Sequence, residues 1–250
     1  MVRESISLAL LEDMGVNEPK IKLIPDLAFA FHSSSTLEAQ DWLRSHKVGF
    51  EKDQPLLGIT AILLPNQQYT SETQIRYEAA IADAIEHFYD QYNGRTILFT
   101  QVGGSKYVSD DRIPTARIAS LAKERNIPSE FIGLAQSPDI LKGAYGLMSM
   151  FLGTRLHSNL FAISEGVPTL ALAYFHKTHG VMQMIGLGEW VLNAKDVDSG
   201  NLIQHVDALW KKREVVTQQI QNISSSLSQK ASQTMRIIAS DFYETDHATN

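Results

Sequence analysis

The sequence predicts an α/β fold in which a parallel sheet carries helices on both of its faces. From residue 55 onward, short apolar runs alternate with longer segments whose apolar residues recur at helical spacing. Strands that alternate with helices in this way are typical of a parallel, Rossmann-like sheet. Hydrophobic residues make up 44% of the 250 positions, which is enough to bury a sizeable core.

The first segment of the chain contains one predicted helix and one predicted strand. The helix spans residues 3–14, whose apolar side chains fall near one face before Gly15 stops it, and residues 20–24 alternate like a strand. A lone helix–strand unit cannot bury its apolar face. We therefore expect residues 1–31 to be the remnant of an N-terminal α/β domain, the rest of which lies in a longer chain or comes from a partner chain.

The remainder of the chain divides into three parts. Residues 32–54 are polar and mixed, so we expect a linker, with a short helix around Trp42 and Leu43 as the alternative. Residues 55–200 are predicted to form the sheet domain, and residues 201–250 a long helix that packs back across the fold and ends in a polar tail. Within the sheet domain, strands are expected at residues 55–64, 96–101, 130–132 and 190–192, helices at 71–92, 113–125, 137–146 and 178–185, and a strand–turn–helix–strand unit at 151–174.

The composition excludes several classes of protein. A formal net charge of −6 argues against a nucleic-acid binder, which would show a basic face. The absence of cysteine excludes disulfides, thiol nucleophiles and cysteine metal sites. No apolar run approaches the ~20 residues that span a bilayer, and the first residues lack a signal-peptide pattern. We expect no transmembrane segment and a location in the cytoplasm or at the inner face of the membrane.

The most informative motif is the turn that joins a predicted strand to a helix near residue 155. Arg155 and His157 lie where that helix begins. A helix start offers unpaired N–H groups and the positive end of its dipole, which suit an anion. An arginine adds a planar fork that can bind phosphate or carboxylate, and a histidine can move a proton near neutral pH. The turn therefore predicts an anion site with proton-transfer chemistry, for which a small phosphorylated substrate is the natural ligand.

Further candidate binding residues follow other predicted strands. Lys177 stands beyond one strand end and can reach an anion, whereas Gly103 and Arg112 lie in and after a glycine-rich turn. The loops at residues 101–105, 154–158 and 174–177 all fall at strand C-termini, where parallel sheets bind ligands. We expect them to converge on one crevice.

Structural alternatives remain open for each of these residues. Arg155 can form a salt bridge at the sheet edge, His157 can be an inert histidine at a helix start, and the acidic pair before Arg112 can be a solvated helix cap. Glu165 can hold a ribose, play a structural role or pair with a basic residue. Arg3 can line an interdomain cleft or form a charge pair in the first turn of its helix.

The motif Arg155-Leu156-His157, together with Glu165-Gly166-Val167-Pro168 and residues 174–177, resembles the polysaccharide pyruvyl transferase family. Further matching features extend over nearly the whole chain, including Arg3-Glu4, Pro25-Asp26, Gly103 with Asp110-Asp111-Arg112, and Lys177 before Gly180. The resemblance implies a two-domain fold like that of the GT-B glycosyltransferases, of which this chain would hold the C-terminal half and the end of the N-terminal half.

The same resemblance implies transfer of a pyruvyl group from phosphoenolpyruvate to a sugar, with formation of a pyruvate ketal. Arg155, Leu156 and His157 would contact phosphoenolpyruvate. The acceptor would be a sugar or a lipid-linked oligosaccharide of a cell-surface polysaccharide. No metal or organic cofactor is expected. Two alternatives stay open: a nucleotide-sugar glycosyltransferase of the same architecture, and a truncated, non-catalytic domain.

Overall fold

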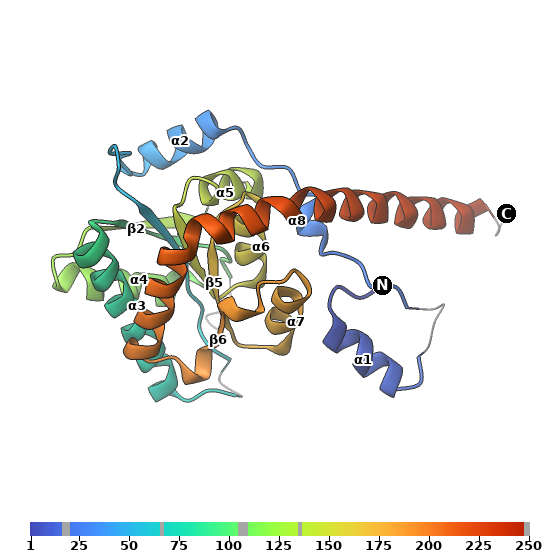
Figure 1. Ribbon diagram of the computed structural model, residues 1–250, viewed down its shortest axis with the longest axis horizontal. Helices are drawn as coiled ribbons and strands as arrows, with labels where there is room; N and C mark the ends of the chain where they lie inside the picture. Colours follow the sequence, from blue (N-terminus) through green and yellow to red (C-terminus); the bar gives the residue numbers. More distant parts are fainter. Residues whose placement is uncertain (17–20, 66–67, 105–109, 135–136, 248–250) are drawn as a thin grey trace.

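The computed structural model describes residues 1–16, 21–65, 68–104, 110–134 and 137–247, with side chains up to residue 240. Its centre is a parallel sheet whose strands follow the order β3-β2-β1-β4-β5-β6 (Figure 1). The strands are β1 (Leu56–Thr60), β2 (Arg95–Thr100), β3 (Ser129–Leu134), β4 (Met150–Gly153), β5 (Thr169–Ala173) and β6 (Val191–Asn193). The predicted α/β class and the parallel sheet are confirmed.

The central strands are buried on both faces. Every residue of β1, β4 and β5 is buried, as expected for parallel strands covered by helices on either side. Strand β1 is shorter than its apolar run, because Ala61, Ile62 and Leu64 are buried but make no strand pairing. Trp190, predicted to begin the last strand, instead ends a short 3-10 helix, Gly188–Trp190, before β6.

Helices cover the two faces in separate groups. Helices α3 (Ser71–Tyr92) and α4 (Arg112–Glu124) pack against each other, and so do α5 (Pro138–Tyr145) and α6 (Leu156–Ser164). Right-handed crossovers place the first pair on one face, and the second pair with α7 (His176–Met184) on the other. The direction of the strand order reverses between β1 and β4, and ligands bind parallel sheets outside the strand ends at such a point.

The N-terminal segment lies against α7 rather than in the sheet (Figure 1). Helix α1 (Ser5–Asp13) buries none of its residues and begins at Glu4, whose carboxylate accepts hydrogen bonds from the N–H groups of Ile6 and Ser7. The strand predicted at residues 20–24 is wrong for the described part of that range, because Leu23 forms only an isolated parallel bridge with Val2. No further described strand adjoins this pair to extend it into a ladder.

Residues 32–54 contain a helix that is docked on the sheet domain. Helix α2 (Thr36–Ser45) starts with a capping box in which Ser35 and Glu38 satisfy each other's backbone N–H groups. Ala39 and Leu43 are fully buried, and α2 packs against α5. The expected linker therefore includes the short helix that was its alternative, and this helix is part of the packed domain.

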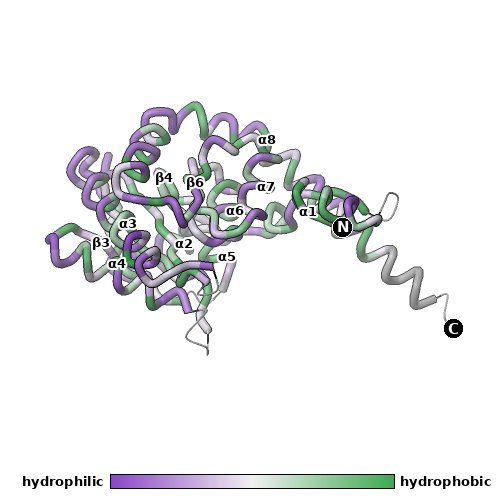
Figure 2. Tube along the Cα trace, turned by 90° about the horizontal axis from the view of Figure 1, so that it is seen from below, coloured by the Kyte–Doolittle hydropathy of each residue, from purple (hydrophilic) through white to green (hydrophobic). Residues whose placement is uncertain are grey.

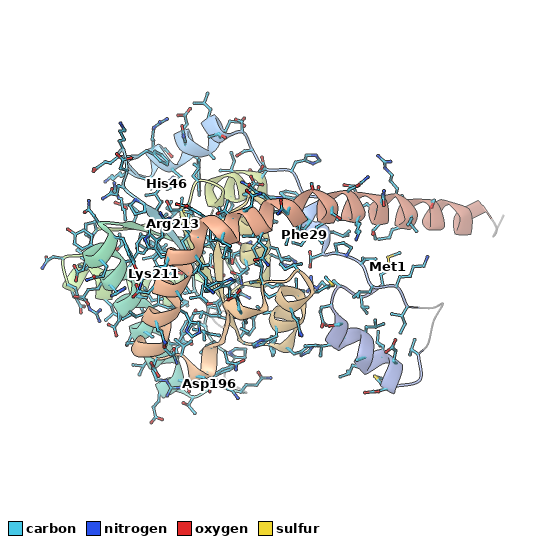
Figure 3. All side chains as sticks on the ribbon, in the orientation of Figure 1. Met1, Phe29, His46, Asp196, Lys211 and Arg213 are labelled. Atoms are coloured by element: carbon cyan, nitrogen blue, oxygen red, sulfur yellow. The ribbon has the colours of Figure 1, made fainter. Side chains whose placement is uncertain are left out.

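Helix α8 (Ser199–His247) runs across the molecule and projects beyond it (Figure 1). Its first part packs on α3, where Trp210 contacts the rings of Phe88 and Tyr92, and Arg213, labelled in Figure 3, lies over Trp210. It then crosses the 3-10 helix Leu27–Phe29. Figure 2 shows apolar residues along its projecting part, of which Met235, Ile237 and Ile238 are exposed. Among the described helices, α8 included, none combines the length and apolarity needed to cross a membrane.

Candidate functional site

Residues of three loops lie together at the carboxyl edge of the sheet, whereas the single crevice expected of loops 101–105, 154–158 and 174–177 stays a prediction. Arg155 ends the loop after β4, Asp111 ends the loop after β2, and Tyr174 follows β5. The Arg155 guanidinium donates to both oxygens of Asp111, with Nη2 at 2.6 Å from Oδ1 and Nε at 3.1 Å from Oδ2. Burial alone lowers the pKa of Arg155, but its bonds to Asp111 and the nearby Tyr174 raise that pKa above its ordinary value.

His157 faces away from this pair, toward the N-terminal segment. It is the second residue of α6 and its side chain is 54% exposed. Its Nε2 lies 3.4 Å from Nη1 of Arg3 and 3.9 Å from a carboxylate oxygen of Asp26. Among the described residues, no hydrogen bond or ion pair joins Arg155 to His157 directly.

Asp26 links two parts of the N-terminal segment, which contacts α6 through the 3-10 helix Leu27–Phe29. Its side chain is only 5% exposed and accepts a hydrogen bond from Arg3 at 2.6 Å and one from the N–H of Ala28 at 2.9 Å. The buried Lys142 of α5 reinforces this docking, because its ammonium donates to the backbone oxygens of Ala28 and Phe31.

Lys177 lies within electrostatic range of both Arg155 and Arg3. It lies in the first turn of α7, with its ammonium 5.8 Å from the centre of the Phe175 ring. Burial lowers its pKa, and so do the positive charges of Arg3 and Arg155, with only Asp26 opposing them. In the described part of the chain, no carboxylate lies within ion-pair distance of this ammonium. The site therefore has excess positive charge around Lys177.

His157 is held in its neutral form by the same surroundings. Burial lowers its pKa below the ordinary value of 6.5, the nearby charges of Arg3 and Lys177 lower it further, and Asp26 opposes the change. A neutral imidazole at pH 7 can accept a proton. Beside it opens a cleft of about 630 Å³, whose walls include Arg3, Asp26, His157 and Phe161.

The other predicted binding residues occupy different surroundings. Leu156 is buried in the core, so its side chain packs rather than faces the cleft. A Cβ at Gly103 would overlap the side chain of Leu134, which explains the glycine by close packing. Arg112 is half exposed and pairs with Asp110 through Nε at 2.8 Å. Contact of any of these three residues with a substrate stays a prediction.

Glu165 pairs with a basic residue, as one of its alternatives proposed. Its carboxylate lies 3.7 Å from the ammonium of Lys142. Two other residues of the candidate site were underestimated from the sequence. Asp26 was only a matching feature of the family and Asp111 was weighed as a solvated cap, whereas both are nearly buried and hold arginines of the site. The sequence features that could have indicated these two roles were the turn Pro25-Asp26 and the acidic pair Asp110-Asp111.

The fold is that of a Rossmann-like α/β domain, and the comparisons with known proteins identify the family. The family model of polysaccharide pyruvyl transferase matches residues 1–176, and the chain belongs to this family. The amylovoran biosynthesis protein AmsJ of Erwinia amylovora is 27% identical over 225 residues, which cover 88% of this chain and 53% of AmsJ. The chain thus spans about half the length of this curated relative.

Solved structures support the fold. The glycosyl transferase family 9 protein of Veillonella parvula DSM 2008 superposes with a TM-score of 0.51 at 13% identity, covering 85% of this chain and 61% of that one. The arginine-glycosylating EarP superposes with a TM-score of 0.52 at 12% identity, covering 89% and 73%. The predicted likeness to half of a GT-B fold is thereby confirmed.

Proposed function

We propose that this protein carries the donor-binding half of a pyruvyl transferase, which moves a pyruvyl group from phosphoenolpyruvate to a sugar of a cell-surface polysaccharide precursor. Family membership supports transfer in polysaccharide biosynthesis. The observation that carries the donor assignment is the charge around Lys177, where Arg3 and Arg155 approach from two other segments and lower its pKa. An anionic ligand would relieve this repulsion between like charges.

The chemistry of phosphoenolpyruvate fits this charge. The molecule carries a phosphate and a carboxylate, roughly three negative charges near neutral pH. Arginine forks, a lysine and the free N–H groups at the start of α6 are the groups that bind such anions. Arg3, Arg155 and Lys177 together offer enough N–H donors for both anionic groups of the donor.

The proposed reaction forms a pyruvate ketal. C3 of phosphoenolpyruvate takes up a proton, and the oxygen of one sugar hydroxyl bonds to C2 as that hydroxyl loses its proton. A second hydroxyl of the same sugar then bonds to C2 and loses its proton, while the C2–O bond to phosphate breaks and phosphate leaves. We assign to His157 the removal of a hydroxyl proton, because its lowered pKa leaves the imidazole neutral.

We also propose where the acceptor binds. A sugar or lipid-linked oligosaccharide would bind between this domain and an additional α/β domain, in a longer form of the chain or on a partner chain, in the cytoplasm or at the inner face of the membrane. The greater length of AmsJ supports an additional domain. So does the isolated parallel bridge between Val2 and Leu23, which is too small to be a stable sheet by itself.

Phosphate release tests this function. Phosphoenolpyruvate is mixed with a panel of lipid-linked and nucleotide-linked sugars, once with this chain and once with the chain fused to the part of AmsJ that has no counterpart in it. We expect acceptor-dependent release from the fusion protein, its loss in His157→Asn, and no change in Lys212→Met, whose lysine pairs with Glu189 away from the cleft. No release with any acceptor would contradict the assignment and favour a non-catalytic domain.

The nucleotide-sugar alternative is separated by thermal shift. If phosphoenolpyruvate is the donor, it raises the Tm of this chain whereas UDP-sugars do not. A Tm that rises with a UDP-sugar alone would support a glycosyltransferase instead. In the structure Glu165, the residue that would hold a ribose, is paired with Lys142, which weakens that alternative.

A further inference from the structure

Asp111 is nearly inaccessible to solvent, and its side chain does not cap the helix that follows it. It occupies the residue before α4, where an aspartate ordinarily caps the helix by accepting from its first N–H groups. Its side chain makes no such capping bond. The carboxylate, 1% exposed, is turned instead toward Arg155, which is 44 residues away in the sequence.

The backbone fixes the position of this carboxylate. The N–H of Val102 donates to Oδ2 of Asp111 at 3.0 Å, and the N–H of Asp111 donates to the carbonyl of Val102 at 2.9 Å. The hydroxyl of Thr115 donates to the Asp111 carbonyl at 2.6 Å. Asp111 is thus held from the loop after β2 and from α4, so its two oxygens form a rigid acceptor for whatever faces them.

The bonds to Asp111 use a specific part of the Arg155 guanidinium. They engage Nε and Nη2, which form the side edge of the fork. A guanidinium has five N–H donors, so Asp111 does not engage the end of the fork, formed by Nη1 and the second hydrogen of Nη2, and Tyr174 lies within hydrogen-bonding reach of this arginine. That end can bind a carboxylate or phosphate with two bonds. Because the desolvation cost of a buried ion pair offsets much of its Coulombic gain, orientation is the better explanation for the pair.

We propose that Asp111 is a positioning residue that fixes the Arg155 fork so that the end formed by Nη1 and Nη2 is presented to the anionic donor. The inference rests on the proposed function in assigning the anion to Arg155. Asp111 also neutralises the charge of Arg155, so this arginine contributes directed bonds while Lys177 supplies the net positive charge. Asp111 itself touches no ligand and acts only through Arg155.

A double-mutant cycle tests the inference. The variants are Asp111→Asn, Arg155→Ala and the double variant, and the probes are phosphoenolpyruvate and inorganic phosphate, titrated by calorimetry. Asparagine keeps the shape and the acceptor for Val102 but loses the charge that holds the fork. We expect Asp111→Asn to raise the Kd about tenfold in the wild-type background and less than twofold in the Arg155→Ala background. An equal effect in both backgrounds, or a lower Tm with an unchanged Kd, would overturn the proposal.

Asp207→Asn is the matched control. Asp207 is also a hydrogen-bonded carboxylate, but it joins α8 to His87 and Tyr92, away from the site. We expect this variant to lower the Tm and to leave both Kd values unchanged. If the wild type binds inorganic phosphate but not phosphoenolpyruvate, phosphoenolpyruvate is not the donor. The double-mutant cycle is then evaluated from the Kd values for inorganic phosphate.

A readout that needs no ligand completes the test. In protein labelled with ¹⁵N-arginine, the Nε–H of Arg155, identified by its loss in Arg155→Ala, should exchange slowly with water because Asp111 accepts from it. Asp111→Asn should make that exchange at least tenfold faster. Equal exchange rates of the Arg155 Nε–H in wild type and variant would show that Asp111 does not hold the fork. This result would overturn the inference even if neither anion binds.

Discussion

At the scale of single residues, the site is defined by charges that are not balanced locally. Arg155 has Asp111 and Arg3 has Asp26, but Lys177 has only distant compensation. The same lysine acts on His157, because its charge lowers the pKa of the imidazole together with burial and Arg3. The protonation state of His157 therefore depends on a residue of another helix.

Replacing Lys177 by methionine should raise the pKa of His157. One of the positive charges that disfavour the imidazolium is removed, while Asp26, which favours it, remains. The pKa is measured from the ¹³Cε1–¹H shift of His157 as a function of pH. Lys212→Met, a change at an exposed surface pair, should leave it unchanged. A His157 pKa that stays constant or falls in Lys177→Met would disprove the coupling.

The lowered pKa of His157 also predicts a pH dependence of stability. In the unfolded chain the imidazole binds a proton near pH 6.5, whereas the folded protein binds it only at lower pH. The unfolded state thus holds more protons between these values, and the free energy of unfolding falls as pH drops below about 6.5. In His157→Asn this part of the slope should be absent in urea titrations at several pH values. An identical slope would contradict the depressed pKa.

At the scale of elements, helix α1 lies against α7. None of its residues is buried, and it begins at the nearly inaccessible Glu4. Gly180 of α7 leaves room for that carboxylate, because a Cβ there would overlap it. Gly180 therefore helps to set the position of Arg3, because it makes room for the side chain of the next residue, Glu4.

Gly180→Ala should loosen α1 without unfolding the domain. Loss of a side-chain cap costs about 1 kcal/mol, which corresponds to roughly fivefold faster hydrogen exchange of the amides in Ser5–Asp13. Gly133→Ala is the matched control, because a Cβ at Gly133 meets no atom within 4 Å. Unchanged protection of α1 in Gly180→Ala would show that this contact does not hold the helix.

Elements whose pattern is local were predictable, and contacts between them were not. The alternation after residue 55 predicted the sheet, and α3 was predicted with its observed bounds because apolar spacing and Asn93-Gly94 define them. The strand–turn–helix arrangement around Arg155 was also predicted, whereas anion binding at this turn stays a prediction. Pairings across the sheet, such as Asp111 with Arg155, leave no periodic signal. The prediction of a strand near Leu23 was wrong because a strand needs a hydrogen-bonded neighbour, and alternation within one segment does not show whether such a neighbour exists.

At the scale of the molecule, α8 is anchored at one end and free at the other (Figure 1). Trp210 lies 5.2 Å from the Phe88 ring and 5.1 Å from the Tyr92 ring, and Asp207 accepts from Tyr92. Burial and the bond to Asp207 raise the pKa of Tyr92 to about 12, so this hydroxyl stays a donor over the whole physiological range.

Trp210→Ala should destabilise the protein by about 3 kcal/mol, at the lower end for such truncations because this tryptophan is partly buried. Ile238→Ala, on the projecting and exposed part of α8, should change the free energy of unfolding by less than about 0.5 kcal/mol. Urea denaturation measures both. Similar effects of the two substitutions would mean that the two parts of α8 do not differ as described.

Calorimetric titration of phosphoenolpyruvate into the wild-type chain and into Arg155→Ala is the most direct test of the anion site at the start of α6. We expect saturable binding by the wild type and a loss of at least tenfold in affinity in the variant, with an unchanged circular dichroism spectrum. Equal affinity of the two proteins for phosphoenolpyruvate would contradict the placement of the donor beside Arg155.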